Sequence, residues 1–278
     1  MGTPPGPPRF VCGLSLLDRR AVGILSLSLA TTKGATLMAR AQSVDLSHAD
    51  NGGRTPAHSR AAGGGHVKAL RMLWKEAGAK VDAEDGEGRI SLTLALAGGH
   101  ESVVAALLEA GAGVNAGTGQ RPVHAAAERG MVEMLRVLVD KGAEVDAEDG
   151  AGRTALTVAL AFGQEAAARA LLEAGAGVNA GTGRRPLHGA AEGGMMEILR
   201  ELVDKGADVE AEDGEGRTAL MLALVFGQEA AAQALLEAGA GVKAGTGQRP
   251  LHAAARKGME EMARELVVCA IVSQAPEP

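Results

Sequence analysis

Short stretches rich in Ala and Leu, each closed by glycine, recur along most of the chain. Within stretches such as residues 131–140 and 164–174, the apolar residues fall at helical spacing. Leucine pairs at 107–108, 171–172 and 235–236 supply an apolar stripe in the second stretch of each pair. Because Ala and Leu favour helix and glycine permits the positive φ at which helices end, the pattern predicts pairs of short helices.

The closing glycines define a repeating unit. The first helix of each pair is expected to end at a mid-repeat glycine, namely Gly99, Gly130, Gly163, Gly194, Gly227 or Gly258. The second is expected to end at a Gly-Ala pair that begins at Gly111, Gly142, Gly175, Gly206 or Gly239. One pair of helices cannot bury its own apolar face, so neighbouring units must stack and stability is spread along the array.

Two motifs alternate along the chain with a longer period. The first returns at intervals of 64 residues, as Gly117–His124, Gly181–His188 and Gly245–His252. The second lies between its copies, as Glu84–Arg89, Glu148–Arg153 and Glu212–Arg217. The individual units therefore alternate between about 31 and 33 residues, which is typical of a repeat array rather than one compact core.

A tetrapeptide at the start of each first helix connects these units to a known family. Its copies are Thr55-Pro-Ala-His58, Arg121-Pro-Val-His124, Arg185-Pro-Leu-His188 and Arg249-Pro-Leu-His252. They resemble the Thr-Pro-Leu-His signature of the ankyrin repeat, which has a 33-residue period. The resemblance covers residues 50–268 and implies an all-α solenoid of stacked helix-turn-helix units with β-turn fingers. Short Gly-Thr-Gly fingers are then expected to alternate with longer acidic fingers along one edge.

The resemblance divides the chain into four parts. Residues 1–35 are expected to be a disordered or leader segment, and residues 36–49 an N-terminal half-repeat cap. Residues 50–272 form the array of about seven repeats, and residues 273–278 a disordered tail. The stretch 9–41 carries five basic residues against a single acid, so an organelle transit peptide is an alternative to a poorly ordered leader.

Composition and charge exclude several classes of function. Aromatic residues make up only 1% of the chain, and the net charge is −6. A nucleic-acid surface needs clustered Lys and Arg, and no apolar run approaches the roughly 20 residues of a membrane helix. Cys12 and Cys269 lie at opposite ends of the chain, and in an extended array they would be far beyond the roughly 7 Å limit for a disulfide. This cysteine usage suits a reducing compartment, and we expect a cytoplasmic protein.

The repeated histidines suggest chemistry but are interpreted as structural. They are His58, His124, His188 and His252. They match the signature histidine of the ankyrin repeat, which by that resemblance hydrogen-bonds to backbone between repeats. Ligands of one metal ion must converge within about 2–2.6 Å of it, whereas these histidines recur once per unit along a stack.

The two loop motifs are also interpreted as structural. The glycine-rich residues 111–121 lack the Gly-Lys-Ser/Thr that a phosphate loop requires. The acidic residues 84–88 and their copies lack the Asp-x-Asp-x-Asp-Gly spacing of a calcium loop, which favours a solvated acidic turn. No Ser/His/Asp or Cys/His arrangement stands out. The sequence therefore predicts a protein that is not an enzyme and holds neither cofactor nor metal.

The resemblance also implies where a protein partner would bind. Ankyrin-like proteins use the finger tips and the exposed side of the first helices, on a concave face. The two residues before the mid-repeat glycine are candidates, among them Phe162 and Phe226, and at polar positions Glu128, Arg129, Glu192, Arg256 and Lys257. Glu87 and Glu215 are candidates on the acidic fingers. An aromatic side chain on such a face is a natural anchor, although each Phe could instead pack against its neighbouring repeat.

These observations predict a protein-interaction module or scaffold that binds a protein through its concave face and finger tips. A regulatory or targeting subunit, such as a ligase adaptor or an enzyme inhibitor, is the alternative. The apolar segment Leu266–Val272 stands where a Gly-Ala stop is expected. It is an unusual cap, a contact for a partner or the end of a shortened array, so the expected monomer could associate through it.

Overall fold

The protein is described from a computed structural model, which places residues 49–58, 67–75, 79–242 and 250–272. The expected leader at 1–35, the expected cap except for Ala49, and the tail at 273–278 lie outside the described residues. The regular elements of the described ranges are all α-helices, as the sequence predicts.

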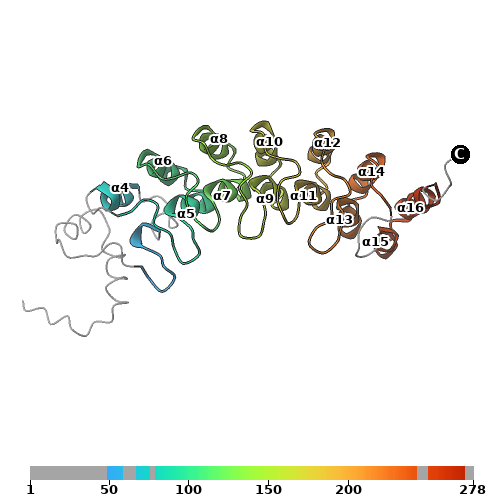
Figure 1. Cartoon of the computed structure of the whole chain (residues 1–278), viewed down its shortest axis with the longest axis horizontal. Helices are drawn as coiled ribbons and strands as arrows, with labels where there is room; N and C mark the ends of the chain where they lie inside the picture. Colours follow the sequence, from blue (N-terminus) through green and yellow to red (C-terminus); the bar gives the residue numbers. More distant parts are fainter. Residues whose placement is uncertain (1–48, 59–66, 76–78, 243–249, 273–278) are drawn as a thin grey trace, which may run out of the picture.

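The helices form two layers in an arc (Figure 1). The inner layer consists of α5 (Ser91–Gly98), α7 (Pro122–Glu128), α9 (Ala155–Ala161), α11 (Pro186–Gly193), α13 (Ala219–Phe226) and α15 (Pro250–Lys257). The outer layer consists of α4 (Val67–Lys75), α6 (Glu101–Glu109), α8 (Val132–Asp140), α10 (Glu165–Glu173), α12 (Met196–Asp204), α14 (Glu229–Glu237) and α16 (Glu260–Val272). The inner helices and the finger loops lie on the concave side of the arc.

Local sequence fixes where each inner helix begins and ends. Thr154 and Thr218 are N-caps, because their hydroxyl oxygens accept hydrogen bonds from the backbone N–H of Thr157 (3.3 Å) and Met221 (3.4 Å). Proline opens α7, α11 and α15, where its missing N–H costs nothing. The mid-repeat glycines have positive φ, from +66° at Gly194 to +79° at Gly227. The helix ends predicted from these glycines are confirmed.

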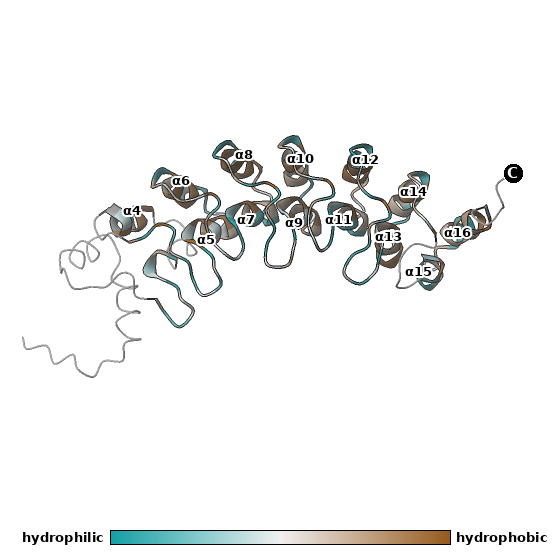
Figure 2. Cartoon of the chain, viewed as in Figure 1, coloured by the Kyte–Doolittle hydropathy of each residue, from teal (hydrophilic) through white to brown (hydrophobic). Residues whose placement is uncertain are grey.

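The core runs without interruption along the array, between the layers and between successive units. The alanines at one position of successive inner helices are fully buried and let the two layers approach closely, at Ala126, Ala159, Ala190 and Ala223. Figure 2 shows the outer helices hydrophobic toward the inner row and hydrophilic on the far side. No single unit could bury this surface alone, so the fold depends on stacking.

The loops between outer and inner helices are joined from unit to unit by polar side chains. The carboxylate of Asp82 accepts from the N–H of Gly113 (3.0 Å), and Asp146 accepts from Gly177 (2.8 Å). At the next junction, Asn115 donates to the carbonyl of Gly142 (2.9 Å) and accepts from the N–H of Glu144 (2.9 Å). Asn179 makes the same pair of bonds one period later. Carboxylate and amide junctions therefore alternate, as the two kinds of unit do.

The last outer helix differs from the others. α16 spans 13 residues, whereas α14 spans 9. Leu266 is buried, but Val267, Val268 and Ile271 are 41%, 58% and 65% exposed. The segment therefore covers its own unit with one face and presents apolar side chains on another. In the part of the chain that the structure places, no helix has the length and apolar character needed to cross a membrane.

Candidate protein-interaction surface

Each long finger is held by an aspartate that folds back on an arginine four residues later. The Asp213 carboxylate accepts from the backbone N–H groups of Glu215 (2.9 Å) and Arg217 (3.0 Å). The Arg217 guanidinium donates to its other oxygen through Nε (2.9 Å) and Nη2 (2.8 Å). The pairs Asp85–Arg89 and Asp149–Arg153 repeat this arrangement. The carboxylate thus holds the turn closed through hydrogen bonds to the backbone and to the arginine.

These aspartates are not the solvated acids that the sequence suggested. The side chains of Asp85 and Asp213 are 0% and 1% exposed, whereas Glu87 and Glu215 on the same fingers are 65% and 71% exposed. Burial by itself raises the pKa of each aspartate, but hydrogen bonds from the following backbone and arginine outweigh it and lower the pKa below the ordinary value. The solvated-turn interpretation therefore holds for the glutamates and is wrong for the aspartates.

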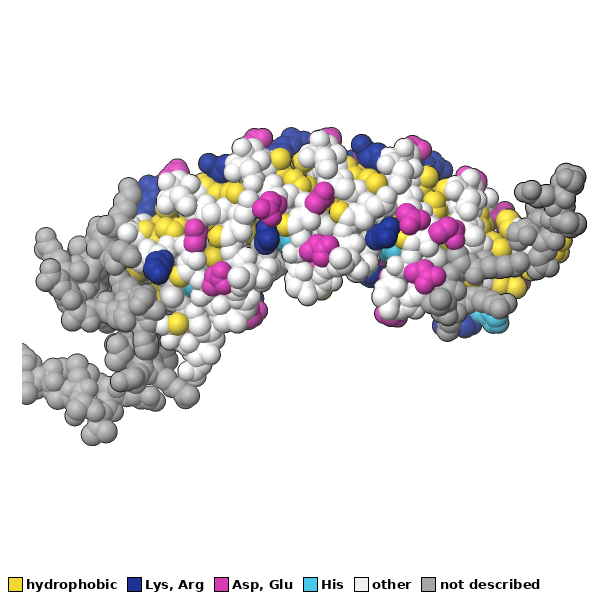
Figure 3. Space-filling model, in the orientation of Figure 1, with side chains coloured by type: hydrophobic (Ala, Val, Ile, Leu, Met, Phe, Trp, Pro, Cys, Tyr) yellow, Lys and Arg dark blue, Asp and Glu magenta, His cyan; other side chains and the backbone are white. Residues whose placement is uncertain are grey.

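The short fingers lie against the long finger that precedes them. The hydroxyl of Thr118 donates to Glu84 (2.7 Å), and the N–H of Gly119 donates to the carbonyl of Gly88 (3.1 Å). One period later, the hydroxyl of Thr182 donates to Glu148 (2.9 Å), and the N–H of Gly183 donates to the carbonyl of Gly152 (3.4 Å). The expected alternation of finger lengths is present in the described ranges, but long and short fingers form pairs. Figure 3 shows the finger edge as separate projections with hollows between them.

The signature histidines tie each inner helix to the next finger. His58 Nε2 lies 2.7 Å from the carbonyl of Ala83, and His124 Nε2 lies 3.0 Å from that of Arg153. His188 Nε2 lies 3.0 Å from the carbonyl of Ala211, and its Nδ1 accepts from the N–H of Arg185 (3.1 Å). At His188, where Nδ1 accepts and Nε2 faces a carbonyl oxygen, the bonds require a neutral ring with its proton on Nε2. His252, in the last unit, is exposed.

We expect the free energy of unfolding to fall on mild acidification because of His124 and His188. Desolvation is the main cause that lowers the pKa of both histidines below 6.5, although nearby Asp149 and Asp213 raise it in part. As the pH falls, these two histidines therefore become protonated at a higher pH in the unfolded chain than in the folded chain. The stabilisation that the two neutral histidines provide is fully present above about pH 6.5 and is lost as the pH falls toward their folded-state pKa.

Urea unfolding at pH 7.5, 6.5 and 5.5 measures this effect. The control is a variant with both histidines changed to glutamine, whose stability should be lower at pH 7.5 but less dependent on pH. Equal slopes in the two proteins would assign the pH dependence to other groups.

The predicted site residues lie at two kinds of position, the ends of the inner helices and the fingers. Phe162 caps the end of α9 and Phe226 is the last residue of α13, and they are 51% and 48% exposed. Arg129, Arg256 and Lys257 are exposed at the ends of α7 and α15. Neither Phe is buried by a neighbouring repeat, which favours the anchor interpretation over the packing interpretation.

The glutamate candidates are already engaged within the chain. Glu128 accepts from Gln120 (2.7 Å), and Glu192 pairs with Arg184 (2.5 Å). On the fingers, Glu87 and Glu215 pair with Arg89 and Arg217, each at 2.8 Å. A partner must therefore compete with these pairs, which makes the glutamates weaker candidates than the two Phe.

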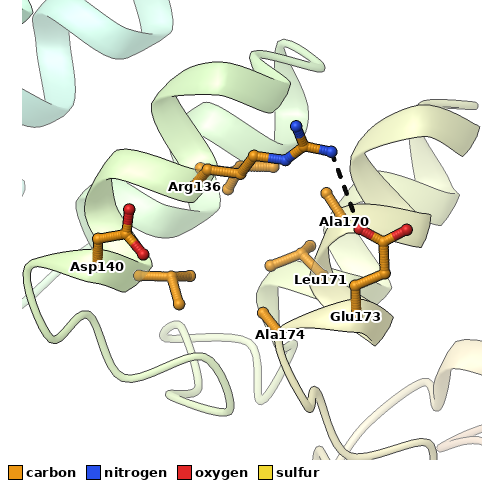
Figure 4. A pocket seen from close by; sticks show the side chains of 8 residues that line it. Arg136, Asp140, Ala170, Leu171, Glu173 and Ala174 are labelled. Atoms are coloured by element: carbon orange, nitrogen blue, oxygen red, sulfur yellow. Dashed lines mark ion pairs between the residues drawn. The ribbon is translucent and has the colours of Figure 1, made fainter.

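A pocket that the sequence does not predict lies on the outer face, between α8 and α10 (Figure 4). Arg136 of α8 and Glu173 of α10 approach to 3.8 Å across it, over a floor that includes Leu171. The small side chains of Ala170 and Ala174 leave the space open. Arg136 also contacts Glu133 of its own helix (3.5 Å). The pocket is therefore a gap between the outer helices of neighbouring units that the Arg136–Glu173 ion pair crosses. In the described ranges, no three metal-binding side chains gather in one place.

Comparison with known proteins supports this reading of the fold. A family model described as "Ankyrin repeats (3 copies)" matches residues 27–118, 113–182 and 175–245. The crystal structure of the human ASB11 ankyrin repeat domain superposes with a TM-score of 0.65 at 29% identity. It covers 80% of this chain and 98% of that one.

Two curated relatives show how such arrays occur in longer proteins. Human ankyrin repeat and SOCS box protein 16 is 34% identical over 228 residues, which are 76% of this chain and 50% of the relative. The Arabidopsis thaliana E3 ubiquitin-protein ligase KEG is 37% identical over 161 residues, which are 56% of this chain and 10% of the relative. The chain thus spans half or less of the length of these relatives. From its repeats, its helix pairs and these matches, the chain belongs to the ankyrin repeat family.

Proposed function

We propose that the chain is a non-catalytic interaction module that binds a partner protein through its concave face and finger tips. Ankyrin repeats mediate protein–protein interaction, and this array presents what such binding needs. The observation that carries the proposal is the pair of exposed aromatics, Phe162 and Phe226, in a chain with only three Phe. Large aromatic side chains at a rigid surface dominate binding energy in protein interfaces.

The finger edge adds a charge pattern that a partner must match. Residues 206–217, which lead into and form one long finger, contain five acidic residues and one arginine. Residues 175–185, which form a short finger, contain two arginines and no acid. An acidic long finger therefore follows a basic short finger along this edge. Complementary charges of this kind direct the orientation and rate of association more than they raise affinity.

Photo-crosslinking with the full chain tests where a partner binds. A benzophenone amino acid would be placed at Glu215 on a finger tip and, as a matched control, at Ala105 on the outer helix α6. Both positions are exposed. The proposal expects crosslinks from Glu215 only. Crosslinks from Ala105 alone would move the binding surface to the convex side and contradict the proposal.

Replacing both Phe162 and Phe226 with alanine should weaken partner binding by about tenfold or more. Because both side chains are about half exposed, the free energy of unfolding should change by about 1 kcal/mol or less for each. The measurement is the affinity for the crosslinked partner, by titration calorimetry, with urea unfolding as the control. Unchanged affinity would remove these two residues from the site.

A second candidate is a targeting subunit in protein ubiquitination. It is favoured by the similarity to KEG, which is itself an E3 ubiquitin-protein ligase. In that case, the captured partner should be ubiquitinated less in cells that lack the chain. Unaltered ubiquitination and partner levels would leave the simple interaction module as the function.

We also propose that the chain is a cytoplasmic monomer whose exposed Val267, Val268 and Ile271 allow weak association. Light scattering over a concentration series tests the oligomeric state. Fluorescent reporters with the full chain and with residues 42–278 test the location. A reporter that reaches an organelle only with residues 1–41 would contradict a cytoplasmic location.

A further inference from the structure

The residues just before the mid-repeat glycines form a row across the ends of the inner helices. From α7 to α15 this terminal row reads Arg129, Phe162, Gly193, Phe226 and Lys257. Successive inner helices pack against one another, so residues at the same position are neighbours. The row thus has two aromatics separated by a glycine, with a cation at each end.

The two aromatics of the terminal row flank a gap. Phe162 and Phe226 are exposed, and Gly193 between them has no side chain. Neighbouring packed helices lie about 8–10 Å apart, so the two Phe are separated by about 16–20 Å. A ligand that touches both must be a chain several residues long rather than a small molecule.

A hollow of about 320 Å³ occupies this gap between α9 and α11. Its walls include Leu160, Glu165, Gly189, Glu192, Gly193 and Met195. It is open because Gly193 stands where the equivalent unit has Arg129. Bulky apolar side chains fill hollows of this kind in well-packed interfaces.

The neighbouring junctions are closed by glutamine. Gln164 donates to the carbonyl of Glu128 (3.3 Å) across α7 and α9, and Gln228 donates to that of Glu192 (3.3 Å) across α11 and α13. Between α9 and α11 the equivalent residue is Met195, which makes no such bridge. The sequence therefore leaves this junction open at the centre of the terminal row.

The charges along the terminal row determine where a bound segment should carry charged or apolar side chains. Arg129 and Lys257 are exposed at the two ends of the row. At the centre, Glu165 is exposed on the wall of the hollow, and the carboxylate of Glu192 is held by Arg184 at 2.5 Å. Carboxylates are therefore attracted to the ends of the row and repelled from its centre.

We propose that the terminal row binds one linear segment of a partner protein, with apolar side chains at its centre and carboxylates on both sides. The inference rests on the proposed function and names the kind of partner. An extended chain advances about 3.3 Å per residue, so two apolar residues six positions apart span about 20 Å and point to the same side. Acidic residues two positions further out lie on the same side and about 7 Å further along, within reach of the long side chains of Arg129 and Lys257.

Peptide display tests this proposal with the full chain as the target. The probe is a random library of 16-residue peptides, and the selected peptides are synthesised and titrated. The expected consensus has two bulky apolar residues about six apart, with Asp or Glu outside them. The key variant is Gly193→Arg, which copies Arg129 of the equivalent unit. A Cβ at 193 meets only the flexible end of Met195 (2.5 Å), so the fold should be kept.

Gly193→Arg is expected to weaken the selected peptides by about tenfold or more, by filling the hollow. The matched control, Ala105→Arg, adds the same side chain to an exposed position of α6 and should leave affinity unchanged. Three results would each overturn the proposal. The selected peptides could lack acidic residues outside the apolar pair, they could bind the Gly193→Arg variant with unchanged affinity, or the library could show no enrichment at all. Crosslinks to a partner from Glu215 would still support the concave face as the interaction surface, so the two failures are distinguishable.

Discussion

Replacing Asp213 with alanine should lower the free energy of unfolding by about 3 kcal/mol or more, the cost of breaking a buried ion pair. Its carboxylate is 1% exposed and accepts two backbone N–H groups and two guanidinium bonds. Alanine leaves those donors without their acceptor at the turn that joins α12 to α13. The effect should be measured by urea unfolding at pH 7.

Glu215→Ala is the matched control for Asp213→Ala. Glu215 pairs with the same Arg217 at 2.8 Å but is 71% exposed, so its removal should cost less than about 1 kcal/mol. Because the pKa of Asp213 is lowered in the folded chain, its contribution is complete above about pH 3.8 and is lost as the pH falls below that value. Equal losses in the two variants at pH 7 would show that the buried carboxylate does not hold the finger.

The layers and helix ends of this fold follow from the sequence because local signals and tertiary packing agree. Proline or threonine stands at the start of α7, α9, α11, α13 and α15, glycine follows the end of each inner helix from α5 to α15, and the buried alanines recur with the repeat. The period also predicts that units stack, since an isolated pair of short helices cannot bury its apolar face. Because the units repeat, the architecture can be predicted from local sequence without any knowledge of contacts between distant residues.

Side-chain burial within the fingers and open space between units are harder to predict from the sequence. The burial of Asp85 and Asp213 does not follow from their charge, although their spacing of four residues to Arg89 and Arg217 repeats in every long finger and is the signal for it. Charge alone indicated solvent exposure, whereas the fixed Asp–Arg spacing indicates a closed turn. The hollow beside Gly193 depends on Met195 replacing a bridging glutamine, and its significance shows only when neighbouring helices are placed side by side.

The two Phe illustrate the opposite case, in which the exposure that one interpretation of the sequence expects agrees with the structure. Their position before the mid-repeat glycine predicted exposure at the end of the inner helices, and both are about half exposed. In the proposed site, what they bind depends on the row they form with Gly193, Arg129 and Lys257. Specificity in a repeat array thus resides in how one position varies from unit to unit, while the other positions maintain the stack.

Gly88→Ala should be destabilising by about 3 kcal/mol, because two costs add at this position. Gly88 has φ +71°, where a side chain costs about 1–2 kcal/mol. A Cβ would also lie 2.5 Å from Thr118 Oγ1 and 2.6 Å from the backbone nitrogen of Gly119, which overpacks the contact between the paired fingers.

Gly163→Ala is the matched control, since Gly163 has the same φ of +71° with nothing within 4 Å. Urea unfolding of both variants separates the cost of φ from the cost of crowding, and hydrogen exchange at the Gly119 amide reports the 3.1 Å bond to Gly88 directly. If both variants lose the same stability and the Gly119 amide stays protected, the paired fingers can move apart at no cost and do not act as one rigid element of the binding surface.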